Sequence, residues 1–187
     1  MNDMEQMLIH RCKRGDLTAF EILISNYEKK TYNIAFGLVG KEEDAKDIAQ
    51  DTFIKAFKSI ATFKEKSSFS TWLYRITINT SKDYLRKRKN TIAFEDINAQ
   101  GEIKDEGLQP QEQLEHMEER KLILSALKEL KEEYSNVIIL KDLNGFSYQE
   151  IADILDINLG TVKSRISRGR FQLRDILSQS SQKFTNN

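Results

Sequence analysis

Residues 146–177 constrain the fold more than any other part of this 187-residue chain. Ser147 and Glu150 have the S-x-x-E spacing of a capping box, in which each side chain bonds the other residue's backbone amide. A helix is therefore predicted to start at Tyr148. Its buried face is marked by apolar residues at helical spacing, namely Ile151, Ala152 and Leu155.

A sharp turn and a second helix are predicted to follow. Asp156 stands where the chain must turn, at a position that glycine commonly fills, and Asp tolerates left-handed backbone better than most residues. Asn158 is suited to cap the second helix. Val162 and Ile166 would pack that helix on the first one. Together these features predict a helix-turn-helix.

The outward side of the second helix is basic. Residues 157–174 include five basic residues and no acidic one. Such a face can be merely solvated, but that alternative leaves the cap, the turn and the close Ala–Val spacing unexplained. We therefore predict DNA binding through this helix. The candidate contact residues are Lys163, Ser164, Arg165, Arg168 and Arg170.

Composition predicts an all-α protein without catalytic machinery. The chain has one proline and eight glycines, and no apolar run reaches membrane-spanning length. Cys12 is the only cysteine, so an internal disulfide is excluded and a reducing cytoplasm is the expected setting. His10 and His116 lie far apart without clustered ligands, so no metal site is predicted. No nucleophile signature or glycine-rich phosphate loop occurs, and we expect neither a cofactor nor an enzyme.

The net charge of zero conceals an uneven distribution along the chain. Residues 1–90 carry 17 basic and 12 acidic groups, and residues 120–187 carry 11 and eight. Residues 91–119 carry one basic and nine acidic groups, a net charge of −8. With the helical periodicity, this predicts two small helical domains, 1–90 and 111–187, joined by a flexible acidic linker at 91–110.

Four helices are predicted in the first domain, at about residues 4–14, 16–36, 42–60 and 71–88. Asp16 and Ser70 are the expected caps of the second and fourth helices. In the second domain, helices are predicted at about 111–130 and 132–143 before the helix-turn-helix. The outward face of the third helix carries Asp47, Gln50 and Asp51.

The fourth helix has the composition of a single-strand nucleic-acid surface. Its end is a run of four basic residues at 86–89, and a Lys–Ser loop precedes it. Aromatic rings stack on bases, amides read base edges and cations follow phosphates. The residues that fall on one face are Trp72, Arg75, Asn79 and Arg86. A core position for Trp72 is an equally good interpretation of the pattern.

Three strings, in their order and spacing, resemble the extracytoplasmic-function (ECF) sigma factors of the bacterial sigma-70 family. DAKDIAQDTF at 44–53 is similar to the family's region-2 helix that binds the polymerase clamp. FSTWLYRI at 69–76 is similar to its −10 recognition helix, and residues 145–173 are similar to its region-4 helix-turn-helix. Asp156 and the turn NLGT at 158–161 depart from the family's usual residues.

The resemblance implies a role in transcription initiation, with the chemistry left to the polymerase. Asp47, Gln50 and Asp51 would bind the β′ clamp of core RNA polymerase, and the apolar side of region 4 would hold the β flap. The linker would run toward the RNA exit path. An anti-sigma factor is an expected partner, and in this family it is often membrane-anchored.

The resemblance also implies two promoter-DNA surfaces. The −35 element would be read in the major groove by the basic residues of the last helix. The loop 63–69 would receive a base flipped from the −10 strand. The implied −10 contacts are Phe63, Lys64, Ser67, Phe69, Trp72, Arg75, Asn79 and Arg86.

Two other kinds of protein remain open at this stage. An ordinary helix-turn-helix repressor or activator would explain the C-terminal part, and it would usually bind a palindrome as a dimer without polymerase. A helical adaptor with solvated basic faces would bind no DNA even when polymerase is present.

Overall fold

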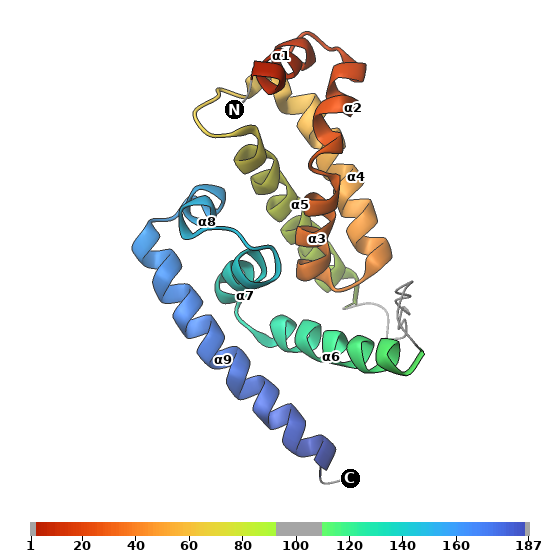
Figure 1. Cartoon of the computed structure of the whole chain (residues 1–187), viewed down its shortest axis with the longest axis vertical. Coiled ribbons are helices and arrows are strands. Elements are labelled where there is room, and N and C mark those ends of the chain that lie inside the picture. The colour runs from red at the N-terminus through yellow and green to blue at the C-terminus, as the bar shows by residue number, and fades with distance from the viewer. Residues whose placement is uncertain (1–2, 93–109, 186–187) are drawn as a thin grey trace. The chain divides into compact units, whose positions relative to one another are not determined.

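The computed structural model describes residues 3–92 and 110–185, and these residues form helices and connecting turns with no β-strand among them (Figure 1). The predicted all-α fold is therefore confirmed. The chain divides into two compact units, with Met1–Ile97 in the first and most of residues 98–187 in the second. Most of the predicted linker lies outside the described residues, so the domain boundaries stay predictions. Within the described stretches, no helix is both long and apolar enough to cross a membrane.

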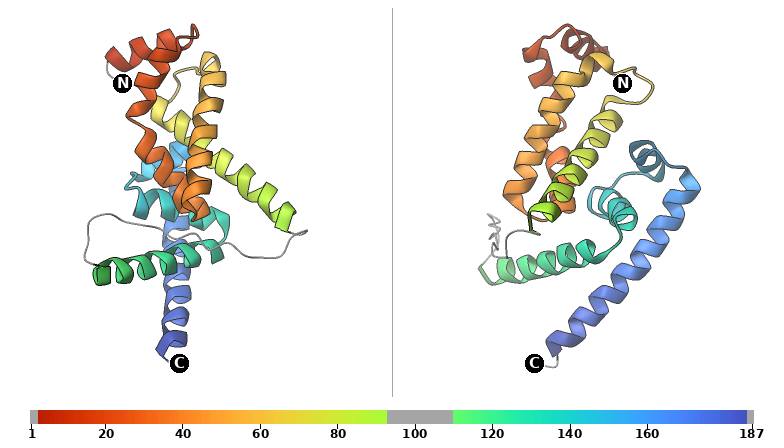
Figure 2. Two further views of the ribbon diagram at one scale, coloured as in Figure 1. Left: turned by 90° about the vertical axis from the view of Figure 1, so that its right-hand side faces the viewer. Right: turned by 180° about the vertical axis from the view of Figure 1, so that it is seen from behind.

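The described residues of the first unit form five α-helices and one short 3₁₀ turn. They are α1 (Asp3–Cys12), α2 (Leu17–Ser25), α3 (Glu28–Val39), α4 (Glu42–Ser59), η1 (Ile60–Thr62) and α5 (Phe69–Ile92). Helices α3, α4 and α5 pack against one another, and α1 packs on α2 (Figure 2). A hydrophobic core joins α1 and α2 to the end of α4 and the start of α5; its largest fully buried side chains are Ile9, Leu23, Ile60, Phe69 and Leu73.

The predicted continuous helix at 16–36 is wrong, because the chain breaks it between Ser25 and Glu28. Asp16 does cap its start, accepting a hydrogen bond from Ala19 N at 3.0 Å. At the break, Tyr27 turns its ring against the rings of Phe69 and Tyr74, at centroid distances of 5.4 and 6.3 Å. The Tyr27 hydroxyl also donates a hydrogen bond to Glu5. The pKa of this phenol is raised, mainly by burial and secondly by the bond to Glu5. These tertiary contacts outweigh the local preference for one helix.

The cap of α5 also differs from the prediction. Helix α5 begins at Phe69, and Ser68 rather than Ser70 provides the capping oxygen, which accepts from Thr71 N at 3.1 Å. The Ser70 hydroxyl lies 2.8 Å from that of Ser68. The earlier start makes Phe69 the first residue of the helix, and its ring is fully buried in the core. The gain from burying this ring favours the earlier start.

In the second unit, the part that the structure describes forms four α-helices and a π-helical turn. They are α6 (Pro110–Glu129), α7 (Glu132–Ile138), η2 (Ile139–Leu143), α8 (Tyr148–Leu155) and α9 (Leu159–Thr185). Helix α9 is a long rod, and it packs on α6 and α7 (Figure 2). At Gly169 the packing is so close that an added Cβ would lie 3.0 Å from Ile138 Cγ1 and 3.3 Å from Tyr134 Cβ.

The helix-turn-helix forms through the local interactions predicted for it. Ser147 N donates to Glu150 Oε2 at 2.8 Å and Glu150 N donates to Ser147 Oγ at 3.2 Å, which completes the capping box. Asp156 adopts the left-handed conformation with φ of 56°. Asn158 caps α9, since its Oδ1 accepts from Thr161 N at 2.7 Å. The predicted cap, turn and second cap are all confirmed.

Candidate polymerase and nucleic-acid interfaces

Helix α4 presents an exposed acidic and amide face opposite its buried face. Asp47, Gln50 and Asp51 are all exposed. The opposite side consists of small and branched residues that are buried, namely Ala45, Ile48, Ala49, Thr52 and Ala56. The first turn is held by an ion pair between Lys46 and Glu42 at 2.7 Å. The fold therefore does not bury the three predicted polymerase contacts, and they are available to a partner.

Of the two arginines near the basic end of α5, one packs against α4 and the other is exposed. Arg88 forms an ion pair with Asp44 at 2.9 Å, and Asp44 also accepts a hydrogen bond from Tyr84. The pKa of the Tyr84 hydroxyl is raised, mainly by burial and secondly by its hydrogen bond to Asp44. Arg86 is instead exposed and pairs with Asp83, one turn earlier on its own helix, at 3.0 Å. Arg88 thus joins α5 to α4, whereas Arg86 faces solvent.

The aromatic residues around the loop 63–68 form a cluster whose inner members are buried. Phe63 is 4% exposed and Phe69 is 0% exposed. Trp72 is half-buried, with its ring 5.1 Å from that of Phe63 and 5.7 Å from that of Phe69. Direct DNA contact by Phe63 and Phe69 does not fit this burial, because neither ring reaches the surface. Both rings support Trp72 from beneath, so Trp72 is partly core and partly surface.

The other predicted −10 residues are more accessible than the two phenylalanines. Lys64 and Asn79 are exposed, while Ser67 and Arg75 are half-buried. Trp72 and Asn79 are seven residues apart, two helical turns, and therefore share one side of α5. The loop and this side of the helix bring together a ring edge, an amide and cations, which are the groups that bind single-stranded DNA.

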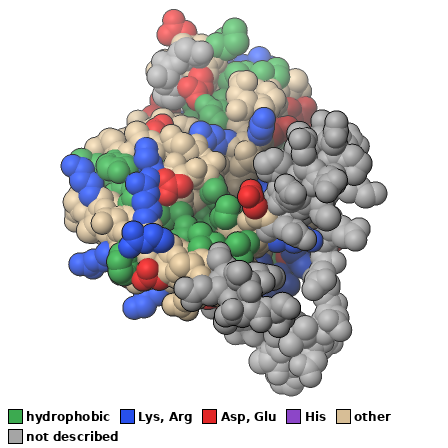
Figure 3. Space-filling model, turned by 60° about the horizontal axis from the view of Figure 1, so that its bottom comes forward, with side chains coloured by type: hydrophobic (Ala, Val, Ile, Leu, Met, Phe, Trp, Pro, Cys, Tyr) green, Lys and Arg blue, Asp and Glu red, His purple; other side chains and the backbone are tan. Residues whose placement is uncertain are grey.

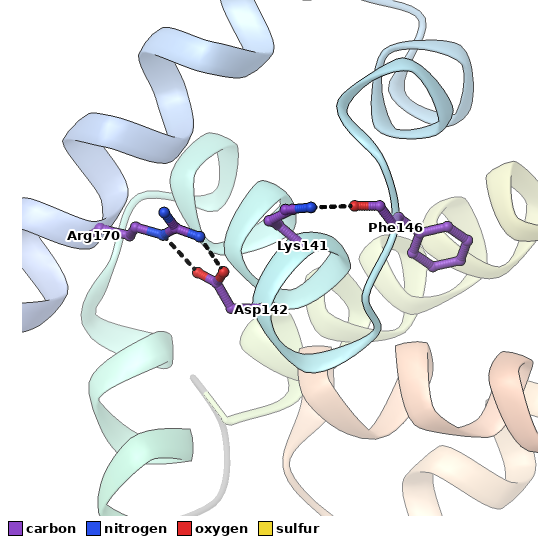
Figure 4. A network of polar contacts seen from close by, with 4 residues as sticks. All are labelled: Lys141, Asp142, Phe146 and Arg170. Atoms are coloured by element: carbon purple, nitrogen blue, oxygen red, sulfur yellow. Dashed lines mark hydrogen bonds and ion pairs between the residues drawn. The ribbon is translucent and has the colours of Figure 1, made fainter.

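The five predicted −35 residues fall into two groups on α9. Lys163, Ser164 and Arg168 are exposed. Arg165 instead forms an ion pair with Glu133 of α7 at 2.9 Å. Arg170 Nε and Nη2 donate to the two carboxylate oxygens of Asp142 in η2, at 3.0 and 2.5 Å (Figure 4). This pairing raises the pKa of the Arg170 guanidinium. Two of the four cations in this set therefore hold α9 against the rest of its unit.

The region around Asp142 is tied together by a second contact. Lys141, beside Asp142 in η2, donates from Nζ to the backbone oxygen of Phe146 at 3.1 Å (Figure 4). The same ammonium lies 5.1 Å from the centre of the Tyr148 ring. These contacts anchor the chain immediately before the capping box of α8.

A shallow groove of about 490 Å³ runs along α9 from the predicted DNA face. Its cations are Lys163, Arg170 and Arg174, and its aromatic residues are Tyr148 and Phe171. Phe171 is 58% exposed, with the Arg174 guanidinium 5.3 Å from its ring centre. Figure 3 shows lysine and arginine side chains interleaved with hydrophobic ones on one face of the molecule. The sequence prediction did not include Phe171 and Arg174 among the contact residues, although Arg174 belongs to the basic stretch 157–174.

Family models match both units. A model described as "Sigma-70 region 2" matches residues 23–91, and one described as "Sigma-70, region 4" matches residues 120–173.

Two curated relatives are similar over nearly the whole chain. An "ECF RNA polymerase sigma-E factor" of Haemophilus influenzae is 37% identical over 173 residues, covering 89% of this chain and 91% of the relative. The "ECF RNA polymerase sigma factor SigW" of Bacillus subtilis is 36% identical over 181 residues, covering 91% and 97%.

Two solved structures share the fold. CnrH, solved in complex with the cytosolic domain of CnrY, has a TM-score of 0.71 at 25% identity and covers 95% of this chain and 99% of its own. The sigma factor RpoE of Bartonella quintana, solved with the anti-sigma factor NepR, has a TM-score of 0.64 at 27% identity and covers 85% and 96%.

Proposed function

Since this chain belongs to the ECF RNA polymerase sigma factors of the sigma-70 family, we propose that three exposed faces of its helices divide the work of initiation. The protein is a transcription initiation factor that binds core RNA polymerase and directs it to promoters. The polymerase carries out the chemistry, and we place the protein in the cytoplasm with it. The residues that perform each task, and the partner that restrains the protein, form the proposal.

The polymerase clamp binds α4 through Asp47, Gln50 and Asp51. These polar groups are exposed on a helix whose other face is fully used in packing, and this supports an interface rather than a structural role. The apolar side of region 4 holds the β flap. The family relationship supplies the partner, and the exposure of the three side chains supplies the site.

The −10 strand is bound by Trp72, Arg75, Asn79 and Arg86, with Lys64 and Ser67 in the preceding loop. Phe63 and Phe69 act from beneath by supporting the Trp72 ring. Unstacking a base costs a few kcal/mol, and stacking on an aromatic ring returns about 1–3 kcal/mol per base. One half-buried indole and the neighbouring cations can therefore offset the flipping of one base.

The −35 major groove is read by Lys163, Ser164 and Arg168. Arg165 and Arg170 are positioned by Glu133 and Asp142, and we assign them to holding α9 at its angle. The sequence prediction, by contrast, gave all five of these residues as −35 contacts. The division rests on one observation: Arg165 and Arg170, which form ion pairs within the unit, alternate along α9 with Lys163 and Arg168, for which the described residues show no such pair.

An anti-sigma factor completes the set of partners. The sigma factor RpoE of Bartonella quintana was solved with one, and its fold covers 85% of this chain. We propose that a protein of this class, membrane-anchored in many family members, covers the binding faces until a signal releases them.

The test separates polymerase binding from promoter reading by two double substitutions. Asp47→Ala with Gln50→Ala weakens binding to core polymerase. Lys163→Ala with Arg168→Ala spares that binding and abolishes most −35-dependent transcription, because each good base contact contributes about 1–3 kcal/mol. Core affinity and run-off transcription are measured for both variants. Equal loss of core affinity in the two would contradict the proposal.

Matched controls remove the same groups from other exposed positions. Glu21→Ala with Asn33→Ala removes one acid and one amide from α2 and α3. For region 4, Lys121→Ala with Lys131→Ala removes two exposed cations outside α9. Both control variants are expected to retain core binding and transcription. If a control variant loses the same activity as the variant it is matched to, the loss comes from the change in net charge and not from the position of the residues.

A further inference from the structure

An ion pair links the end of α1 to the loop that the proposed function assigns to the flipped −10 base. Lys13 Nζ lies 2.5 Å from Glu65 Oε1, and the two residues are separated by 52 positions in the chain. The side chains are 24% and 33% exposed, so this is a surface ion pair, of the kind that contributes modestly. Lys13 lies outside the stretch at 23–91 that the region-2 model matches.

The backbone at Glu65 is in a conformation that this residue type disfavours. Its φ is 55°, in the left-handed region, where a Cβ crowds the neighbouring carbonyl and where glycine is the usual occupant. A residue held there must be stabilised by its surroundings. The ion pair with Lys13 is a contact that acts on Glu65 itself, and the neighbouring side chains Lys64 and Lys66 are exposed.

Lys13 also contacts the first residue of the loop. Its ammonium lies 5.6 Å from the centre of the Phe63 ring, a cation–π distance. Phe63 in turn lies 5.1 Å from Trp72, the aromatic residue proposed to stack on DNA. One lysine therefore touches both the entrance of the loop and its strained residue.

Helix α1, which ends just before Lys13, is anchored in the hydrophobic core. Leu8, Ile9 and Cys12, on the turns just before Lys13, are buried in the same core that contains Phe63. Lys13 N also continues the helical hydrogen-bonding pattern to Ile9 O at 2.9 Å. The backbone of Lys13 is thus held by the same core that contains the first residue of the loop.

We propose that Lys13 and Glu65 are positioning residues, which fix the loop 63–69 in the shape that discriminates between bases of the −10 strand. Neither residue needs to touch the base. The inference rests on the proposed function, since it assumes that this loop receives a base. It assigns a part in promoter specificity to the end of α1 and the residue that follows it, which precede the region-2 match.

The experiment compares base discrimination by reconstituted holoenzymes. A library of short single-stranded DNA, carrying each of the four bases in turn at six consecutive positions, is selected by each holoenzyme and sequenced. Lys13→Met and Glu65→Gln each lower the ratio of most to least enriched base at the discriminating position by about two- to fivefold, the range expected for one ion pair. The double variant loses no more than either single one, because both changes break the same contact.

Two further variants separate positioning from direct contact. Lys13→Arg retains the discrimination of the wild type, since it keeps the cation. Glu65→Gly retains more discrimination than Glu65→Ala, because glycine adopts the positive φ without an ion pair. Core binding and −35 duplex binding stay unchanged in all variants, which also shows that they fold.

Three results would overturn the inference. Unchanged discrimination in Lys13→Met and Glu65→Gln shows that the pair has no such role. A uniform loss of affinity for all bases in Lys13→Met shows that Lys13 is a phosphate contact. Additive losses in the double variant show that the two residues act independently. If the wild-type holoenzyme itself shows no discrimination in single-stranded DNA, the proposed function of the loop fails together with the inference, which distinguishes that case from the other three.

Discussion

Two glycines of α9 are expected to respond to the same substitution in opposite directions. In a helix interior, Gly→Ala ordinarily stabilises by up to about 1 kcal/mol, because alanine loses less backbone entropy. Gly160 lies in the first turn of α9, where an added Cβ would meet only Asn158 Oδ1 at 3.4 Å. Gly169 is buried against α7, where an added Cβ would lie 3.0 Å from Ile138 Cγ1.

The change in stability caused by Gly169→Ala depends on whether the neighbours of the added Cβ can move aside. Ile138 is 2% exposed and has no open space to turn into, and Tyr134 Cβ, at 3.3 Å, moves only with the α7 backbone. Overpacking of this kind costs about 1–3 kcal/mol. After the helix gain of about 1 kcal/mol, Gly169→Ala destabilises the contact of α9 with α7 by about 0–2 kcal/mol. Gly160→Ala is neutral or stabilises by up to about 1 kcal/mol.

Hydrogen exchange of the full chain, followed by mass spectrometry, gives the readout for each unit separately. Peptides from α7 and α9 exchange up to about 30-fold faster in Gly169→Ala and up to about fivefold slower in Gly160→Ala, since 1.4 kcal/mol corresponds to a factor of ten. Peptides from α4 and α5 serve as the internal reference and do not change. Slower exchange of α7 and α9 in Gly169→Ala would refute the argument that close packing decides the sign.

Two predictions concern α5. Asn79→Ala lowers open-complex formation, measured by permanganate reactivity of promoter thymines, while closed-complex binding stays nearly intact and a pre-melted −10 bubble restores part of the loss; unchanged thymine reactivity would remove Asn79 from the −10 surface. Ser68→Ala removes the observed cap and destabilises the first unit by about 1 kcal/mol, whereas Ser70→Ala has little effect. Urea unfolding followed by the fluorescence of Trp72, the only tryptophan, checks this, and the opposite order would restore Ser70 as the cap.

The features predicted best from sequence are those that short-range chemistry determines. The capping box at Ser147 and Glu150, the left-handed turn at Asp156 and the cap at Asn158 each depend on neighbours within four residues. Helical periodicity likewise gave the buried face of α4, and with it the exposure of Asp47 and Gln50. In these cases local preference and the global fold agree.

The errors occurred where contacts distant in sequence override local preference. The break after Ser25 exists because Tyr27 packs on rings of α5, more than 40 residues later. The burial of Phe63 and Phe69 follows from the same cluster. The segment predicted as a polar, irregular loop is attached to the core at both ends, by Phe63 and Phe69.

The division of cations on α9 illustrates why composition alone could not assign the −35 contacts. Lys163 and Arg165 lie two residues apart, so they point to different sides of the helix, and only a partner on α7 decides that Arg165 is engaged. The acids that engage Arg165 and Arg170, Glu133 and Asp142, were counted in the sequence merely as charges that offset basic ones. In the folded unit they hold α9 in place, and the cations that the described ion pairs do not engage, Lys163 and Arg168, are those that can neutralise DNA phosphates or bond base edges. The local surplus of positive charge available to DNA is therefore set by ion pairing within the unit, and the net charge of the domain does not report it.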